Sequence, residues 1–204
     1  MAAEASGIGT LARPDRRETQ RRATREKLLS ISVAEFQRNG FAHTDIATIA
    51  ERAGVSRGTF YFHFPTKDDV LGELRIREEH TIVREVAPLL ARSGSLEEVL
   101  RAVVAGVLVA ESRLGTDLIR EICAVQFRPS VVKSDTVADH PVAALVVDLF
   151  SRLPGSGGPQ ERADLAVVFL VGLFGLLSTQ AGPSEERDRL LDSLVTFTLR
   201  GWDR

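Results

Sequence analysis

Apolar residues recur at intervals of three and four along most of this 204-residue chain. That spacing puts them on one face of an α-helix, whereas the alternation that a half-buried strand needs is rare. Glycine and proline are sparse inside the long segments. With 44% hydrophobic residues the chain can bury a sizeable core, so the pattern predicts an all-α fold of about nine helices.

The predicted helices can be bounded by cap residues and by helix-ending glycines. In chain order they span 21–39, 45–53, 56–62, 66–90, 96–114, 116–127, 138–153, 160–180 and 185–202. Thr44 and Ser56 are the expected N-caps of the second and third helices, and Thr66 with Asp69 forms a capping box for the fourth. Helix ends are expected at Gly40, Gly54 and Gly115.

Positive charge is concentrated near the N-terminus, although the net charge is −2. Residues 1–67 carry 11 Lys and Arg against seven Asp and Glu, a net charge of +4. Residues 68–204 carry 15 against 21, a net charge of −6. This division suits contact with phosphates through one end of the molecule.

Other features exclude several classes of protein. The single cysteine, Cys123, excludes an internal disulfide and a cysteine-based zinc cluster, and favours a reducing compartment. The N-terminus has no apolar signal core. The longest nearly apolar run, 165–177, is short of the roughly 20 residues of a membrane span and is expected to form a buried helix. We therefore expect a cytoplasmic protein without a membrane segment.

The segment 46–61 has the residue order of a helix-turn-helix. Ala50 is small where a second helix must cross closely, Gly54 permits the positive φ of a tight turn, Ser56 can cap the second helix, and Phe60 can anchor it inward. Arg57, Gly58 and Thr59 would then occupy the first turn of that helix, which meets base edges in a major groove. An arginine there can grip guanine with two hydrogen bonds.

Further side chains around this motif can reach phosphates. Tyr61 and His63 can donate from the far end of the short helix, and Lys67 and Thr44 from neighbouring helix starts. Each has an alternative that the sequence leaves open. Tyr61 and His63 can instead be core residues, Thr44 a cap only, and Lys67, like Arg57, a solvated charge.

These residues resemble the tetracycline-repressor (TetR) family of bacterial regulators over about a quarter of the chain, from Lys27 to Leu74. The resemblance rests on Phe36, Gly40-Phe41, Thr44, Ile49-Ala50, Ala53-Gly54-Val55-Ser56, Gly58-Thr59-Phe60-Tyr61, Phe62-His63-Phe64, Lys67 and Val70-Leu71. It implies a ligand-responsive repressor that binds a near-palindromic operator as a dimer. It implies DNA contacts by Thr44, Ser56, Arg57, Gly58, Thr59, Tyr61, His63 and Lys67.

The resemblance also implies a division of the chain into two helical domains. We expect a helix-turn-helix DNA-binding domain at 21–66, called the head below. The body, at 67–204, is then the domain that dimerises and binds an effector. Residues 1–20 are expected to form a flexible basic arm. The arm is either solvated or reaches the minor groove through its arginines and those that follow, namely Arg13, Arg16, Arg17, Arg21 and Arg22.

Two helices of the body are candidates for the dimer surface. The helix at 160–180 is apolar around most of its circumference, so it must be buried on several sides, and Gly172 and Gly175 would allow close approach. Together with the helix at 185–202 it could form a four-helix interface between two chains. Alternatively, the first of these helices is the central helix of the monomer, and both roles are compatible.

An effector pocket is harder to predict because the resemblance fades after about residue 90. Polar residues among apolar helices and nearby aromatic residues are the candidates: Arg120, Gln126, Phe127, His140 and Phe150. Each polar candidate is alternatively an exposed or ion-paired surface residue. The effector is expected to be apolar or aromatic. Cys123 lies in an apolar context that favours a buried inert thiol over a redox switch.

No enzymatic constellation is visible, and we expect neither a cofactor nor a metal. The four histidines lack the pairing with carboxylates that metal sites show. Two alternatives to a regulator remain, namely a DNA-structuring or recombination-accessory protein without an effector, and a helical adaptor whose head binds protein. A phosphate-binding head should lose DNA affinity steeply as salt rises, whereas an adaptor should not bind DNA.

Overall fold

The computed structural model describes residues 16–92, 94–125, 127, 140–152, 158–180 and 182–202, and it confirms the all-α prediction for this part of the chain. Nine helices lie in these residues. They are α1 (Arg16–Asn39), α2 (Ile46–Ala53), α3 (Arg57–His63), α4 (Lys67–Ala91), α5 (Leu96–Leu114), α6 (Thr116–Val125), α7 (Pro141–Arg152), α8 (Pro159–Thr179) and α9 (Glu185–Trp202).

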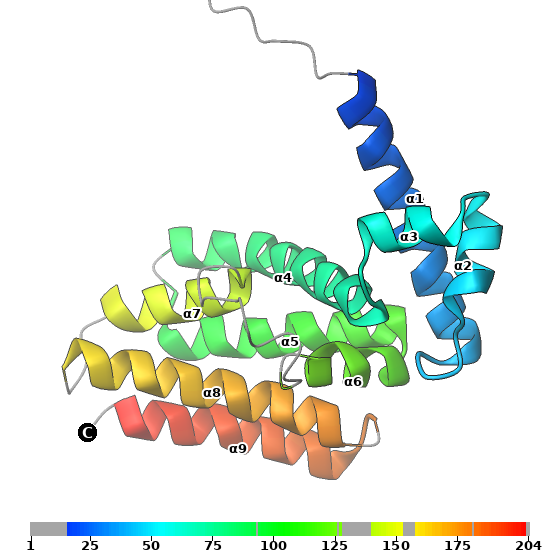
Figure 1. The fold of residues 1–204 in the computed structure, drawn as a ribbon. Coiled ribbons are helices and arrows are strands. Elements are labelled where there is room, and N and C mark those ends of the chain that lie inside the picture. Colours follow the sequence, from blue (N-terminus) through cyan, green and yellow to red (C-terminus); the bar gives the residue numbers. More distant parts are fainter. Residues whose placement is uncertain are drawn as a thin grey trace, which may run out of the picture.

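The first three helices pack together at one end of the molecule, and the first turns of α1 project away from everything else (Figure 1). α2 packs on α1 and on α3, and α3 lies beside the N-terminal turns of α1. The small core between them consists of fully or almost fully buried residues from each helix and the turn after α3: Leu28, Leu29, Phe36, Ile49, Ala50, Ala53, Phe60 and Phe64.

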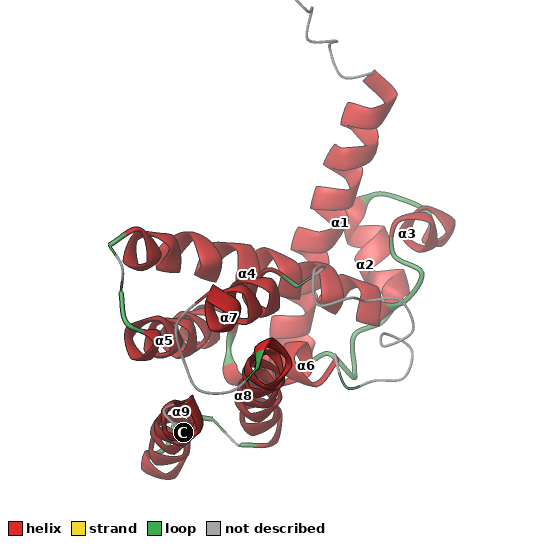
Figure 2. Ribbon diagram, turned by 90° about the vertical axis from the view of Figure 1, so that its left-hand side faces the viewer, coloured by secondary structure: helices red, strands yellow, loops and turns green. Residues whose placement is uncertain are grey.

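The remaining six helices form a larger bundle that α4 joins to the first three. α4 packs on α5, α6 and α7, and α8 packs on α6, α7 and α9. Figure 2 shows α9 at the edge of the bundle, remote from α1. By length and composition α8 could cross a bilayer, a test that the central helix of a soluble bundle also passes.

Cap residues and helix-ending glycines in the sequence correctly predicted most helix ends. Ser56 caps α3 by accepting a hydrogen bond from the amide of Thr59, and Thr66 and Asp69 form the expected capping box of α4. Gly115 follows α5 at the predicted position. The boundaries of α6 and α7 differ from the prediction by two or three residues, since α6 ends at Val125 and α7 begins at Pro141.

Two predictions at the N-terminal end were wrong. Asp45, and not Thr44, caps α2, because its carboxylate accepts the amide of Ala47 at 3.0 Å. α1 begins at Arg16, so the last five residues of the expected arm are helical. The rest of that arm, including Arg13, lies outside the described residues.

Candidate functional site

The turn between α2 and α3 fixes the position of the short helix. Gly54 has φ +65° and ψ +34°, in the left-handed region that glycine adopts without strain. Its amide bonds to Glu51 and that of Val55 to Ala50, which satisfies carbonyls at the end of α2. Ser56 then begins α3, where its hydroxyl also lies 2.9 Å from that of Thr59. The helix-turn-helix geometry expected from the sequence is therefore present.

α3 has a buried side and an exposed side. Phe60 and His63 point into the core, and Thr59 is half-buried. Arg57, Gly58, Tyr61 and Phe62 are exposed, and Arg57 forms no ion pair within the part of the chain that the structure describes. Four neighbouring positions of one short helix thus face solvent with an arginine, a glycine and two aromatic rings.

Phe62 is an exposed residue that sequence reasoning missed. Its side chain is 65% exposed, more than that of Tyr61 at 50%. With 3.6 residues per turn, Phe62 lies on the same side of the helix as Gly58, whereas Phe60 lies opposite. The helical phase of α3 could therefore have identified it. The guanidinium of Arg21 lies over the Phe62 ring, 5.1 Å from its centroid.

The N-terminal turns of α1 line a hollow of about 740 Å³ together with α3. Three arginines of α1 line this hollow together with Thr59, Phe62 and His63 of α3. These are Arg16, Arg17 and Arg21. An exposed aromatic ring and several cations in one open hollow form a surface that can contact the sugar-phosphate backbone of a duplex.

His63 lies in a more enclosed position than the sequence suggested. Its side chain is buried, and its carbonyl oxygen accepts a hydrogen bond from Arg25. Burial, reinforced by the charges of Arg25 and Arg21, lowers the pKa of His63 below its ordinary value. The ring is therefore neutral near pH 7, and a contact with phosphate, which stays a prediction, would be made by a neutral N–H group.

Lys67 and Thr44 both stabilise the turn between α1 and α2. The ammonium of Lys67 lies 2.8 Å from the carbonyl oxygen of Phe41 and 3.0 Å from that of Thr44. The Thr44 hydroxyl is directed inward to the carbonyl of Gly40, at 2.8 Å. Phosphate contacts by Lys67 and Thr44 stay predictions. In this structure the ammonium and the hydroxyl that would make them donate to carbonyl oxygens of the turn.

An ion-pair network joins the head to α4. Arg77 of α4 pairs with Glu26 of α1 through two hydrogen bonds of 2.6 Å and with Glu73 at 2.7 Å. Arg25 of α1 also bonds to Glu73, at 2.7 Å. Burial opposes ionisation of Glu73, but hydrogen bonds from Arg25 and Arg77 outweigh it and hold its pKa below the usual value. α1 and α4 are therefore linked by four charged groups.

The structure does not bring the predicted effector residues together. Arg120 is exposed and pairs with Asp117, and Phe127 is also exposed. Phe150 is fully buried in the core, and Gln126 lies outside the described residues. His140, just before α7, lines a hollow. The thiol of Cys123 is buried as expected, and burial raises its pKa to about 12, so it is protonated at neutral pH.

The hollow beside His140 lies between α4, α7 and α8 and has a volume of about 130 Å³. Sequence reasoning missed its two charged residues, Arg75 and Glu79 of α4, each only 4% exposed. They form an ion pair at 3.7 Å. The signal was present, because both interrupt the apolar stripe of α4 formed by Leu71, Leu74, Ile82 and Val86.

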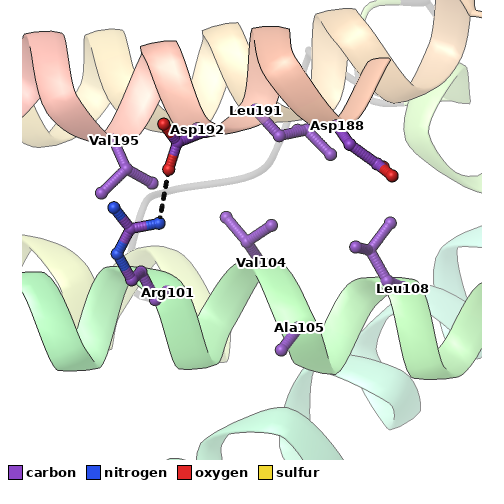
Figure 3. A pocket seen from close by; sticks show the side chains of 8 residues that line it. All are labelled: Arg101, Val104, Ala105, Leu108, Asp188, Leu191, Asp192 and Val195. Carbon is purple, nitrogen blue, oxygen red and sulfur yellow. Dashed lines mark hydrogen bonds and ion pairs between the residues drawn. The ribbon is translucent and has the colours of Figure 1, made fainter. Parts of the chain in front are cut away.

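A second hollow, of about 300 Å³, lies between α5 and α9 (Figure 3). Val104, Leu108 and Leu191 contribute to its apolar floor. At its edge Arg101 pairs with Asp192 across the two helices at 2.7 Å, as the figure shows. Both members of that pair are about half exposed, so this hollow is an open groove with a solvated edge.

The outer sides of α8 and α9 expose large apolar residues. Val167, Val168 and Val171 of α8 are exposed, and Phe197 of α9 is 75% exposed. Gly172 faces inward, since a methyl group there would lie 2.8 Å from Leu194 of α9. A methyl group on Gly175 would meet nothing within 4 Å. Gly172 thus serves packing within the chain, and Gly175 leaves space on the exposed side.

The helix-turn-helix region of this chain is similar in sequence to known regulatory proteins. Residues 28–74 match the model of the family described as "Bacterial regulatory proteins, tetR family". The chain is 36% identical over 64 residues, 31% of its length, to the HTH-type transcriptional regulator AcrR of Shigella flexneri, of which the match covers 29%. It is 27% identical over 199 residues, 89% of its length and 97% of the relative, to an uncharacterized HTH-type transcriptional regulator of Mycobacterium bovis. The matches to the first curated relatives cover less than a third of their length.

Solved structures share the fold over most of the chain. FadR of Thermus thermophilus, a TetR-family transcriptional repressor solved with lauroyl-CoA, superposes with a TM-score of 0.66 and 23% identity. The match covers 87% of this chain and 94% of FadR. A TetR-like transcriptional regulator from Rhodococcus gives a TM-score of 0.53 and 23% identity, over 87% of this chain and 94% of the other. At these identities the likeness concerns the fold.

Proposed function

We propose that this chain is a sequence-specific, DNA-binding transcriptional repressor of the tetR family, whose family model matches residues 28–74. The observation that carries this proposal is the exposed side of α3. Because Phe60 and His63 hold the opposite side in the core, the helix can present Arg57, Gly58 and Tyr61 to a major groove. Such a protein acts in the cytoplasm, where bacterial DNA lies.

Contacts to DNA divide between the helices of the head. Arg57, at the start of α3, reads base edges, and Gly58 lets the duplex approach closely because it has no side chain. Tyr61 and Phe62 flank them. The arginines in the first turns of α1 (Arg16, Arg17 and Arg21) contact phosphates beside the same groove. The contacts of Thr44, Ser56, Thr59, His63 and Lys67 complete the predicted set.

Two copies of the chain bind one operator. α3 has seven residues and spans roughly 10 Å, so one head reads few base pairs. The exposed valines of α8 and Phe197 of α9 provide an apolar surface that a second copy can cover. A four-helix interface made of α8 and α9 from each chain would place two heads on a near-palindromic site.

An effector bound in the body releases the DNA by acting on α4. α4 lines the hollow beside His140 and is also tied to α1 by the network of Glu26, Glu73 and Arg77. A ligand that displaces α4 therefore changes the position of the head. It shifts the equilibrium only if it prefers the arrangement that does not fit the operator. At about 130 Å³ the hollow is too small for an acyl-CoA such as the ligand of the Thermus protein.

Replacing Arg57 with alanine tests base reading by α3. We expect affinity for the operator to fall by about 1–3 kcal/mol, with discrimination lost at one or two base pairs, because a bidentate contact to guanine disappears. Fluorescence anisotropy with operator and with single-base variants measures both effects. Arg120→Ala, which removes an exposed arginine of α6, is the matched control and should leave affinity unchanged.

The effect on random DNA decides the interpretation of that experiment. A loss on random DNA as large as that on the operator would show that Arg57 contributes only charge. A wild-type protein that binds all sequences with similar affinity would instead favour a DNA-structuring protein.

A further inference from the structure

The hollow between α4, α7 and α8 is polar at one end and apolar elsewhere. Its apolar walls come from α7 and α8, and consist of Ala143, Val147, Val167, Leu170, Val171 and Phe174. The polar groups in its lining are those of Arg75, Glu79 and His140. A ligand that matches this lining would have an apolar body with a polar group at one end.

The polar end contains a buried guanidinium that donates hydrogen bonds. Arg75 Nη2 lies 2.7 Å from Nδ1 of His140. The same atom lies 3.1 Å from Nε2 of His140. Because a guanidinium can only donate, the ring nitrogen that accepts from it carries no hydrogen. Glu79 Oε2 accepts the amide of Val142 in the first turn of α7 at 3.3 Å. Arg75 and Glu79 thus hold the start of α7 against α4.

The charges at this end favour an anion over a cation. Arg75 is permanently charged, whereas its partner Glu79 lies 3.7 Å away, longer than a close ion pair. Burial raises the pKa of Glu79, although the charge of Arg75 and the amide of Val142 oppose this shift. Since the α8 walls carry no charge, the guanidinium of Arg75 is the cationic group in the lining with which an anionic ligand can pair.

The volume limits the size of the apolar body. A cavity of about 150 Å³ lined by apolar side chains is known to hold one benzene molecule. The hollow between α4, α7 and α8, with about 130 Å³, therefore suits a single ring or a branched chain of similar volume.

We propose that this hollow binds a small monocarboxylic acid whose carboxylate contacts Arg75 and His140 and whose apolar body is the size of a phenyl ring. The inference rests on the proposed function and specifies the chemical class of its effector. The carboxylate would take hydrogen bonds that now join α4 to the residue preceding α7. Binding would therefore act directly on the contact between α4 and α7.

The groove between α5 and α9 in Figure 3 does not suit such an acid. Arg101 already pairs with Glu97 and with Asp192, each at 2.7 Å. Asp188 adds a further carboxylate to the lining. Because acidic groups outnumber the arginine, an anion would be repelled, and this groove provides a control site.

Binding of three ligands of nearly equal shape tests the proposal. Benzoate, benzamide and benzylamine are titrated into the full-length protein at pH 7 by isothermal calorimetry, with 4-methylpentanoate as an aliphatic acid. We expect the acids to bind once per chain, benzamide at least tenfold more weakly than benzoate, and benzylamine not at all. Equal affinity for benzoate and benzamide, or failure of both acids to bind at millimolar concentration, would overturn the proposal.

Variants assign the binding to this hollow. Arg75→Gln should remove the preference for benzoate over benzamide. Ala143→Leu, which fills the hollow and keeps the Arg75–Glu79 pair, should abolish binding of benzoate and provides the test if the first variant does not fold. Arg101→Gln in the other groove should bind benzoate as the wild type does. Binding of benzoate that survives Ala143→Leu, or that is lost in Arg101→Gln, would place the site elsewhere.

The outcome for DNA separates this inference from the proposed function. If the acids do not bind but the protein binds a selected operator, the ligand class is wrong and the repressor stands. If the ligand-free protein binds no operator, the proposed function itself is wrong.

Discussion

Replacement of Phe197 by arginine is expected to convert the protein into a monomer and to weaken binding to a two-site operator by about a hundred- to ten-thousand-fold. The magnitude follows because two linked heads bind with an effective local concentration that a monomer lacks. Phe197 is 75% exposed on α9, which packs on the helix that carries the exposed valines, α8. In a dimer through these helices an arginine there would bury an unpaired charge in each chain.

Analytical ultracentrifugation gives the oligomeric state, and gel-shift titration with one-site and two-site duplexes gives the affinities. Val109→Arg is the matched control, since Val109 is 58% exposed on α5, and it should remain dimeric. Affinity for a single half-site should be the same in both variants and the wild type. A Phe197→Arg protein that stays dimeric and binds the operator normally would exclude this surface as the interface.

Replacement of Phe60 by alanine is expected to destabilise the head by about 3–5 kcal/mol and to abolish DNA binding. Phe60 is fully buried, and its ring packs near those of Tyr61 and Phe64, at centroid distances of 5.8 and 6.0 Å. Removing it leaves a cavity between α3 and the rest of the head. Because the head core is small, this loss is a large part of its stability.

Hydrogen exchange monitored by mass spectrometry measures the effect locally, since amides of α1–α3 should exchange faster while those of α5 and α8 do not. Phe62→Ala removes the same side chain from an exposed position two residues later. It should change the free energy of unfolding by no more than about 0.5 kcal/mol. Equal destabilisation by both variants would contradict the division of α3 into a buried and an exposed side.

The sequence predicted those features that neighbouring residues determine. The Ser56 cap, the Thr66–Asp69 capping box and the end of α5 at Gly115 each depend on side chains within a few positions. The turn at Gly54 was predictable for the same reason, because its left-handed conformation suits glycine. Local chemistry therefore sufficed for the order and type of the helices and for the position of α3.

Features that depend on distant contacts were not predicted. Threonine is a residue type that often caps helices, but the hydroxyl of Thr44 donates to the carbonyl oxygens of Gly40 and Glu35 instead. Asp45 is the N-cap of α2. Arg75 and His140 are 65 residues apart in sequence, and only packing of α7 against α4 brings them together. Polar residues in α6 and α7 gave no indication of which of them face a shared hollow, so the hollow beside His140 could not be predicted from the sequence.

Selection of bound duplexes from a random DNA pool by the purified, ligand-free protein tests the central claim most directly. If two copies each present α3 to a major groove, the enriched sequences should form an inverted repeat with half-site centres about one helical turn apart or a multiple of it. Enrichment of the repeat should disappear with the Phe60→Ala protein. A pool that shows no enrichment at low salt, or enrichment of a single site without symmetry, would contradict the account.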